Sequence, residues 1–557
     1  AFGITDRQRR PKPALSSVCQ AFAEVSRPPQ TRWPRVSVVV CSFNGERTIR
    51  DCCAGLVRLN YPNFEVIVVD DGSTDRTADI ASEYGFRLIR HPENQGLSKA
   101  RNSGLEAATG EIVAYIDDDA WPDPDWLTYL ATTFMNSDFV SVGGPNVPPP
   151  DDGPIADCVA NAPGNPVHVL LSDGEAEHIP GCNMAFRKAC LEEIGGFDSH
   201  FRVAGDDVDV CWRLRERGWK IGFNPAAMVW HHRRNSVRAY WTQQRGYGRA
   251  EALLEAKWPA KYNSLGHLRW WGRVYDKGTT HALGWWRDRI YRGAWGSAPF
   301  QSLYQPAPGV LASLTLMPEW YFAIIGLGAL AALGSLWRPV LAALPLLLVA
   351  ILALLLQAGS TAAKADFSSP PRSAFGRLKM RSLTMVLHLL QPLARLYGRL
   401  TYGLTPWRRR GVAKFTLPRP RSWALWTQQW RAAEERLAAI ETALKSARAR
   451  VRRGGAFDNW DLEVKGGLFG GGRLLMSVED HGAGTQFVRV RSWPLCRSVG
   501  PMFIFLLASL TVMSAVDQAW IVCAVLGGLT GVLTIRTLLE CGWSAATVLS
   551  AVNCGVG

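Results

Sequence analysis

The feature that most constrains the fold is a regular alternation of short apolar runs with helical patterns, which begins at residue 36. Four Val- and Ile-rich runs have the length and composition of buried strands: residues 36–41, 64–70, 86–91 and 111–117. Three segments between them have the spacing of helices: residues 46–59, 74–84 and 97–108. This order predicts an α/β fold in which helices cover both faces of a mainly parallel sheet.

Polar residues follow three of these strands at the point where each strand ends. The three groups are Ser42-Phe43-Asn44, Asp70-Asp71-Gly72-Ser73 and Asp117-Asp118-Asp119. Open parallel sheets bind ligands at the carboxyl ends of their strands. We therefore expect the three groups to line one crevice.

Three adjacent carboxylates at residues 117–119 repel one another, so the run is stable only where it is solvated, partly protonated or neutralised by a cation. Mg²⁺ binds oxygen ligands, typically one or two carboxylates together with substrate phosphates and water. Asp117 and Asp119 flank the end of a buried strand, where we favour a metal site that also holds a diphosphate. Asp123 and Asp125 are better explained as solvated residues at the start of the next helix, where they suit the helix dipole.

The composition narrows the classes of partner. Lys and Arg total 62 against 48 acidic residues, a net charge of +14, which suits nucleic acid, an anionic membrane surface or phosphorylated substrates. The densest basic stretch, residues 372–453, has no zinc-finger spacing or RNA-binding signature, so we expect membrane lipids and no nucleic acid. The 12 cysteines form no CxxC pair and no secretory signal precedes the first strand, so we expect reduced thiols in a cytosolic compartment.

Two pairs of nearly uncharged runs predict membrane helical hairpins. The runs are residues 320–337 with 339–356, and 503–516 with 519–535. Both turns are poor in Lys and Arg, whereas the first domain and the middle region are rich in them, which places these two regions on the cytoplasmic side. The runs are short, so an interfacial or re-entrant placement stays open. Buried core helices of a soluble protein are a further alternative.

The segment between the hairpins carries no recognisable chemistry. Residues 427–451 have the pattern of a polar amphipathic helix. The alternating runs after it predict a small antiparallel β-meander that turns at residues 481–484. We expect this part to serve packing or partner binding.

Six motifs in order carry a resemblance to a known family. They are CSFNG, VVDDGSTD, NQGLSKARNSG, DDD, GCNMAFRKACLEEIGGFD and GDDVDVCWRLRERGW. Over about residues 34–256 the chain resembles glycosyltransferase family two, which has the A-type, Rossmann-like nucleotide-diphospho-sugar fold. The resemblance implies an inverting enzyme that moves a sugar from a nucleotide diphosphate to an acceptor, with Mg²⁺ or Mn²⁺ as cofactor.

The resemblance also implies roles for residues of the donor site. Phe43 would stack on the base, Asp70 would hydrogen-bond it, and Arg101 would approach the nucleotide or diphosphate. Asp117 and Asp118 would face the ribose and the metal, with Asp119 as the main metal ligand. The other residues expected at the nucleotide sugar are Cys41, Asn44, Asp71, Gly72 and Lys99.

On the acceptor side, the resemblance places the general base in GDDVD, where the family usually has Glu-Asp. We expect Asp207 to be the base, with Asp206 as its neighbour or substitute. The alternative is that both are surface residues in the first turn of a helix over residues 207–217. His231 would contact the metal or the diphosphate, and a structural role is equally open.

The acceptor itself would be lined by residues that follow the GCN motif: Asn183, Gly195, Gly196, Phe197 and Asp198. A simple helix C-cap is an equally good account of the two glycines. The stretch QQRGYGRAE does not match the QxxRW motif of processive polysaccharide synthases. This departure argues against a synthase that extrudes a chain.

These observations predict a glycosyltransferase on the cytoplasmic face of a bacterial inner membrane. It would add one sugar per encounter to a lipid-linked or growing surface-polysaccharide acceptor. The rivals are a polyprenyl-phosphate glycosyltransferase and a catalytically silent scaffold of a glycan export complex. The expected organisation is a disordered basic tail, a catalytic domain, a connector, a hairpin, a basic interfacial region, a helix with the β-meander and a second hairpin: residues 1–33, 34–260, 261–319, 320–357, 358–426, 427–500 and 501–557.

Overall fold

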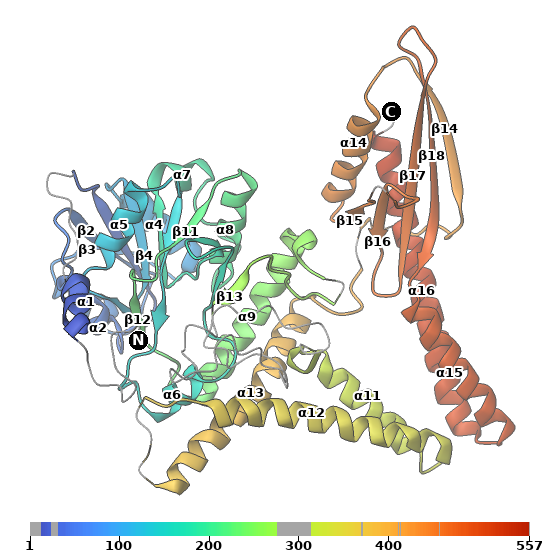
Figure 1. Cartoon of the computed structure of the whole chain (residues 1–557). Coiled ribbons are helices and arrows are strands. Elements are labelled where there is room, and N and C mark those ends of the chain that lie inside the picture. The colour runs from blue at the N-terminus through green and yellow to red at the C-terminus, as the bar shows by residue number, and fades with distance from the viewer. Residues whose placement is uncertain are drawn as a thin grey trace. The chain divides into compact units, whose positions relative to one another are not determined.

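The computed structural model describes residues 13–23, 32–263, 265–275, 314–368, 371, 373–409, 411–412, 414–455 and 457–555. These residues, whose helices and strands Figure 1 labels where there is room, divide into two compact units. Unit 1 contains the described residues of Ala1–Val237, Trp271–Ser313 and Ser360–Leu387. Unit 2 contains those of Arg238–Trp270, Leu314–Gly359 and His388–Gly557. Most of the expected tail and connector lies outside the described residues, although α1 (Pro13–Ala23) is helical where a disordered tail was expected.

The centre of unit 1 is a ten-stranded sheet in the order β13-β8-β9-β11-β6-β10-β4-β1-β2-β3. The four predicted strands are confirmed and run parallel to one another: β1 (Val36–Ser42), β2 (Phe64–Asp70), β3 (Arg87–Arg90) and β4 (Ile112–Asp117). Next to β4 the direction changes, because β10 (Asn183–Arg187) pairs with it antiparallel. The rest of the sheet is made of β6 (Ser141–Gly143), β8 (His168–Leu170), β9 (Glu175–His178), β11 (Ile221–Phe223) and β13 (Arg273–Tyr275).

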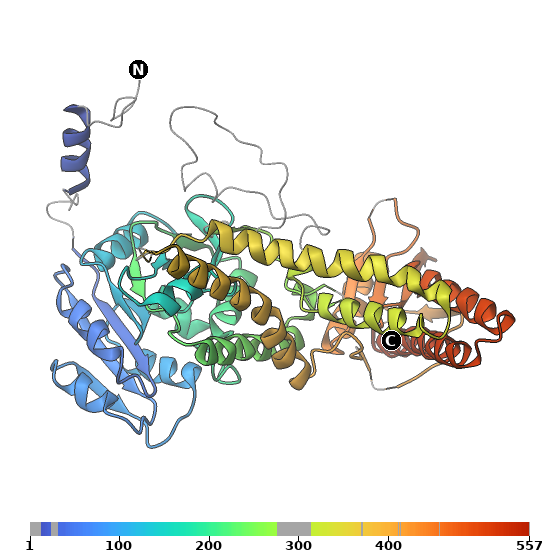
Figure 2. The same ribbon diagram turned by 90° about the horizontal axis from the view of Figure 1, so that it is seen from below.

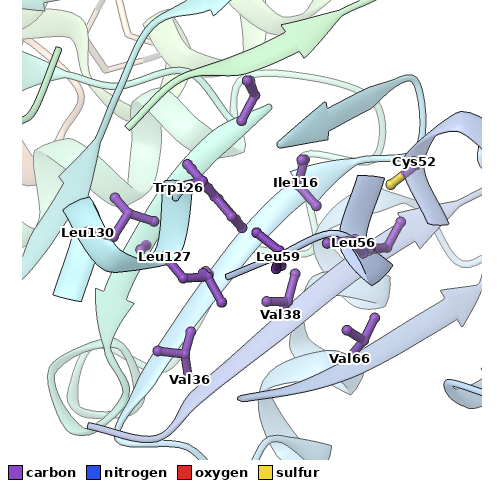
Figure 3. Packing of buried hydrophobic residues seen from close by; sticks show 14 of the residues in the cluster. Val36, Val38, Cys52, Leu56, Leu59, Val66, Ile116, Trp126, Leu127 and Leu130 are labelled. Carbon is purple, nitrogen blue, oxygen red and sulfur yellow. The ribbon is translucent and has the colours of Figure 1, made fainter. Parts of the chain in front are cut away.

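Helices cover both faces of this sheet, as predicted. Alternate β1 residues point to opposite faces, so Val38 packs in one core with helices α2 (Ile49–Val57) and α5 (Trp126–Met135) (Figure 3). Val39 packs in the other core with α4 (Leu97–Ala107) and α8 (Asp206–Glu216). Unit 1 also contains α3 (Thr77–Ser82), α6 (Pro154–Ala160) and α7 (Lys188–Glu193). A small second sheet contains β5 (Ala120–Pro122), β7 (Asn146–Val147) and β12 (Val229–His231).

Unit 2 contains an antiparallel sheet with five strands among the described residues. Its order is β14-β18-β17-β16-β15, with bounds Arg421–Thr427, Gln486–Cys496, Gly470–Asp480, Leu462–Lys465 and Arg450–Arg453. The predicted turn at residues 481–484 joins β17 to β18 and is confirmed. The helix predicted over residues 427–451 is shorter, α14 (Ala433–Ser446), because Thr427 ends β14 and Arg450 begins β15. The two ends of this segment therefore belong to strands, although its polar pattern suggested one continuous helix.

Each predicted pair of apolar runs forms a helical hairpin (Figure 2). The first contains α11 (Trp320–Leu333), the short 3-10 turn η4 (Arg338–Ala342) and α12 (Ala343–Lys364). The second contains α15 (Val499–Val516) and α16 (Trp520–Gly555). Among the described residues, three helical stretches are long and apolar enough to cross a membrane: Arg338–Lys364, Val499–Val516 and Trp520–Asn553. The described part of the chain also contains α9 (Val237–Lys257), α13 (Ala374–Thr401) and the 3-10 turns η1 (Pro259–Lys261) and η3 (Leu314–Leu316).

Helix α16 has two different halves. Its first half is exposed and apolar, with Trp520 66% and Val532 67% accessible. Its second half packs Val548 and Val552 against the five-stranded sheet, in one core with Leu474. The second predicted run, which ended at residue 535, therefore continues as a core helix. We conclude that only the first half suits a bilayer, since the second half is already covered by protein.

Candidate functional site

The loops after β1 and β2 are held together by Asn44. This residue adopts a left-handed conformation (φ 54°), and its backbone N–H donates to Ser73 Oγ at 2.9 Å. Its side-chain Oδ1 accepts a hydrogen bond from Thr74 N at 2.9 Å. Phe43, beside it, is 49% exposed. The first two strand ends therefore form one rim, with an aromatic ring standing free on it.

Asp70 lies at the end of β2, and its side chain is fully buried. Its Oδ1 accepts a hydrogen bond from Ser73 N at 3.0 Å. Its Oδ2 lies 3.1 Å from Arg90 Nε but accepts no hydrogen bond from a described residue. An open hollow of about 400 Å³ lies here, lined by Gly72, Ser73, Thr74, Arg90, His91 and Pro92. A buried acceptor beside a hollow is suited to an N–H donor of a ligand.

Asp71 and Gly72 hold the loop rather than offer a ligand contact. Asp71 accepts hydrogen bonds from Gln95 N at 2.9 Å and Gly96 N at 2.8 Å, and it also contacts His91 Nδ1 at 2.7 Å. Gly72 has φ +74°, and a Cβ there would lie 2.5 Å from the carbonyl carbon of Glu93. The structure therefore supports a positioning role for both residues.

Arg101, on α4, joins the two acidic motifs. It is 3% exposed, its Nη1 pairs with Asp206, and its Nη2 lies 3.2 Å from Asp117 Oδ1. The same Nη2 donates to the carbonyl of Gly181 at 3.2 Å, and the guanidinium stands 5.5 Å from the ring centre of Phe197. Arg101 therefore joins the acidic end of β4 to the first turn of α8. Its two Nη atoms contact the protein's own groups.

The three adjacent carboxylates have different environments. Burial raises the pKa of Asp118 to about 7, with the charge of Asp119 adding to the shift, although Asp118 accepts a hydrogen bond from Ser42 Oγ. Burial also raises the pKa of Asp117, against the charge of Arg101, but a third of that side chain is exposed and solvent moderates the shift. One of the three therefore accepts a proton easily in the absence of a cation.

Asp119 is the carboxylate with most cationic and imidazole partners. Its Oδ1 lies 3.0 Å from His231 Nε2, and its Oδ2 lies 3.2 Å from Arg234 Nη1. Burial alone would raise the pKa of Asp119, but these partners outweigh it and lower the pKa. Asp119 is therefore ionised. His232 is held elsewhere, by Asp152 at 2.6 Å, and that hydrogen bond raises the pKa of His232.

Three side chains of different chemistry offer donor atoms to one point: Asp117, Cys182 and His231. These donor atoms all lie within 4.8 Å of one another. A carboxylate, an imidazole and a thiol at this spacing fit a divalent cation. The predicted ligands Asp117 and His231 are thus brought together, and Cys182 joins them.

The two candidate bases differ in the exposure of their side chains and in the direction in which their pKa values shift. The side chain of Asp206 is 2% exposed and tied to Arg101, and burial raises its pKa to about 6. The side chain of Asp207 is 22% exposed and lies 3.6 Å from His178 Nε2. Burial would raise the pKa of Asp207, but His178, the charge of Arg101 and the N–H of Gly181 lower it to about 2. Both residues lie in the first turn of α8, and only Asp207 is accessible as well as ionised.

The residues predicted to line the acceptor have structural contacts. Asn183 is fully buried; its amide donates to the carbonyls of Pro145 and Ala227 at 3.1 and 2.8 Å, and its Oδ1 accepts from Trp126 Nε1 at 2.8 Å. An acceptor could bind Asn183 only by breaking this network. Gly195 and Gly196 both have positive φ and cap the end of α7, as the simpler alternative predicted.

Four of the predicted residues remain: Phe197, Asp198, Cys41 and Lys99. Phe197 is 2% exposed and packs edge-on against Tyr115, with ring centres 5.2 Å apart. Asp198 accepts a hydrogen bond from His200 N at 3.0 Å. Cys41 is half-buried on β1, and burial raises the pKa of its thiol. Lys99 is exposed on α4.

Sequence reasoning missed two site residues, His178 and Cys182. His178 ends β9, a short strand between β8 and β11 without a strong apolar pattern. Cys182 directly precedes β10, where the run NMAFR contains the only signal, a short apolar stretch. Reading that stretch as a strand beside β4 would have placed Cys182 next to Asp117, because Asn183 pairs with Ile116.

Comparison with known proteins agrees with this architecture. The model of the family described as glycosyl transferase family 2 matches residues 37–195. The chain is 31% identical to the glucosyl-dolichyl phosphate glucuronosyltransferase of Haloferax volcanii, over 35% of this chain and 69% of that protein. It is 30% identical to the pre-mycofactocin glycosyltransferase of Mycobacterium tuberculosis, over 38% of this chain and 47% of that protein. The match thus spans about half the length of the mycobacterial relative.

Among solved structures, the chain is similar to the mannosyltransferase PcManGT of Pyrobaculum calidifontis in complex with GDP-Man and Mn²⁺. The two share 22% sequence identity at a TM-score of 0.38, over 68% of this chain and 94% of that chain.

Proposed function

Because the chain belongs to glycosyltransferase family 2, we propose that it transfers one sugar from a nucleotide diphosphate, with inversion, to a hydroxyl of a lipid-linked or growing surface glycan. The proposed site of action is the cytoplasmic face of a bacterial membrane, which agrees with the three apolar helices. The observation that carries the proposal is the bridge through Arg101, which joins the acidic strand end at Asp117 to the first turn of α8, where the base candidates Asp206 and Asp207 lie.

The donor half of the crevice suits a nucleotide. The exposed ring of Phe43 offers a stacking face for the base, and the buried Asp70 Oδ2 offers an acceptor to one of its N–H groups. The hollow beside Gly72 lies along the same rim. These contacts do not select uracil, guanine or thymine.

The residues at the ends of β4 and β12 fit a divalent cation. Asp117 and His231 would hold it, with Asp119 as the ionised carboxylate beside them. When bound, the cation would neutralise the charge that develops on the departing nucleoside diphosphate. The protein's own contribution is to position Asp117 through Arg101.

Asp207 is the residue proposed to accept the proton of the incoming hydroxyl. It is ionised at neutral pH because its pKa is lowered to about 2, and it is more accessible than Asp206. His178, 3.6 Å away, would stabilise the ionised form. The relative from Haloferax volcanii bears a name that describes a sugar on dolichyl phosphate, which supports a lipid-linked acceptor.

The test is a sugar-transfer assay on the detergent-purified chain, with Asp207→Asn and the control Asp123→Asn. Radiolabelled UDP-, GDP- and dTDP-sugars are offered with Mn²⁺ or Mg²⁺ to lipid-linked glycans and to polyprenyl phosphate. We expect Asp207→Asn to slow transfer to a hydroxyl by about 10²- to 10⁴-fold, and Asp123→Asn to behave like the wild type.

The other outcomes identify the rivals. Transfer to polyprenyl phosphate that survives Asp207→Asn would favour the lipid-phosphate enzyme, since that acceptor is already an anion. A folded wild-type protein that transfers no sugar, and whose melting temperature no nucleoside diphosphate raises, would favour the silent scaffold.

A further inference from the structure

The position of Cys182 is fixed by the sheet. Asp117 ends β4, His231 ends β12, and Cys182 directly precedes β10, which pairs antiparallel with β4 through Asn183 and Ile116. The thiol, the carboxylate and the imidazole therefore reach one point from three different strands. Their donor atoms lie within 4.8 Å of one another. A metal site needs this convergence from rigid elements.

The thiol of Cys182 has no competing role in hydrogen bonding. The residue is 2% exposed, and its Sγ makes no hydrogen bond to any residue that the structure describes. A free buried cysteine usually behaves as a small apolar residue. The surroundings of Cys182 are unusual for that role, because two metal-ligating side chain types meet it there.

His231 can offer Nε2 to a cation only after its ring proton moves. Arg233 Nη1 contacts its Nδ1, and an arginine can only donate, so Nδ1 accepts. Nε2 therefore carries the ring proton and donates it to Asp119 Oδ1 at 3.0 Å. A cation at Nε2 would displace that proton to Nδ1, and Arg233 would have to leave Nδ1 for this to happen.

We propose that Cys182 is a ligand of the divalent cation together with Asp117 and His231, and that the site prefers a transition-metal ion over Mg²⁺. Mg²⁺ favours an all-oxygen environment with near-octahedral geometry. Mixed sulfur, nitrogen and oxygen donors favour Zn²⁺ and Co²⁺. This inference rests on the metal dependence proposed above, and it adds both a ligand and a choice of metal.

The test is a Co²⁺ titration of the full-length protein in detergent, followed by absorption spectroscopy. A cobalt–thiolate bond produces a charge-transfer band in the near ultraviolet, which oxygen and nitrogen ligands do not. We expect the band in the wild type and in the control Cys190→Ser, which removes a half-buried thiol of the same unit. We expect it to be absent in Cys182→Ser and Cys182→Ala.

Affinity gives a second measurement. Cys182→Ser is expected to weaken Co²⁺ binding about 10- to 100-fold. Its affinity for Mg²⁺, measured by competition, is expected to change less than about twofold, because a hydroxyl is an adequate ligand for a hard ion. Melting temperatures and near-ultraviolet circular dichroism of both variants check that the fold is retained, and the alanine variant serves if the serine variant is unstable.

The outcomes separate this inference from the proposed function. Co²⁺ that binds with d–d bands but without the thiolate band would overturn the role of Cys182 and leave the metal dependence intact. A wild type that binds no Co²⁺, with or without UDP, overturns the inference. Sugar transfer that continues in EDTA would overturn the metal dependence as well.

Discussion

The two units both bury carboxylates, but they partner them differently. In unit 1, the side chains of Asp117, Asp119 and Asp206 gather at one edge of the sheet, and Arg101 is the shared cation of two of them. In unit 2, Glu540 of α16 is fully buried and has a complete set of partners. Its Oε2 accepts hydrogen bonds from two backbone N–H groups at 2.7 and 2.9 Å, and its Oε1 lies 2.8 Å from Arg536 Nε.

This difference separates a site from a structural contact. Carboxylates that outnumber their protein partners have shifted pKa values, to about 7 for Asp118 and about 6 for Asp206, and such shifts cluster at functional sites. Glu540 instead closes the end of a strand: its N–H donors belong to Phe469 and Gly470, at the start of β17. We infer that carboxylates in excess of their protein partners mark the candidate site in unit 1. Fully paired carboxylates such as Glu540 instead stabilise the fold of unit 2.

We expect the largest loss of stability when Arg101, the shared cation of Asp117 and Asp206, is removed. Arg101→Met leaves the buried Asp206 and the partly exposed Asp117 without their cation, and we expect it to destabilise the protein by about 3–5 kcal/mol, chiefly through Asp206. Melting temperatures of the full-length chain measure this. The double variant Arg101→Met with Asp206→Asn removes one of the unpaired charges and is expected to recover part of the loss. Equal melting temperatures for the single variant and the wild type would show that solvent, and not Arg101, neutralises the crevice.

A substitution at Glu540 tests whether this carboxylate of unit 2 has a purely structural role. Glu540→Gln replaces a charged acceptor of two N–H groups by a neutral one and removes the carboxylate partner of Arg536, which keeps its hydrogen bond to the carbonyl of Trp407. We expect a loss in folding free energy of about 2 kcal/mol. Limited proteolysis should detect it as faster cleavage of unit 2. Sugar transfer by the variant, measured below its melting temperature, should stay within about twofold of the wild type. A transfer rate that fell as far as in Asp207→Asn would refute a purely structural role.

The parallel core of unit 1 could be predicted from the sequence because its strands are continuous β-branched runs. β1 and β2 were placed within one residue of their observed ends. The grouping of the acidic ends of β2 and β4 on either side of β1 was also predictable, since the carboxyl ends of parallel strands lie at the same edge of the sheet. Cys182 and His178 were not, because each reaches the site through an antiparallel pairing of short strands.

The end of α16 could not be read from composition. An apolar helix that crosses a bilayer and one that packs on a sheet have similar amino-acid compositions. Only what covers the helix, lipid or protein, distinguishes them. The glycines of the GG run at 466–467 were the available signal. A Cβ at either position would collide with Glu540, which shows how closely α16 approaches the sheet.

His168 of β8 is a titratable group outside the candidate site, and we expect it to have a small effect on the pH dependence of folding stability. Burial, with the neighbouring His178, lowers its pKa from 6.5 to about 3, and its Nε2 is buried without a hydrogen bond from a described residue. Between these two pH values only the unfolded chain takes up the proton, so acid stabilises the unfolded state. His168→Phe keeps an aromatic ring against Phe223, whose ring centre lies 5.1 Å from that of His168. The free energy of unfolding of this variant should equal that of the wild type at pH 8 and exceed it by about 2 kcal/mol at pH 5. Melting temperatures from pH 5 to 8 give the comparison, with His200→Gln as an exposed control; parallel curves would mean that His168 is protonated in the folded state.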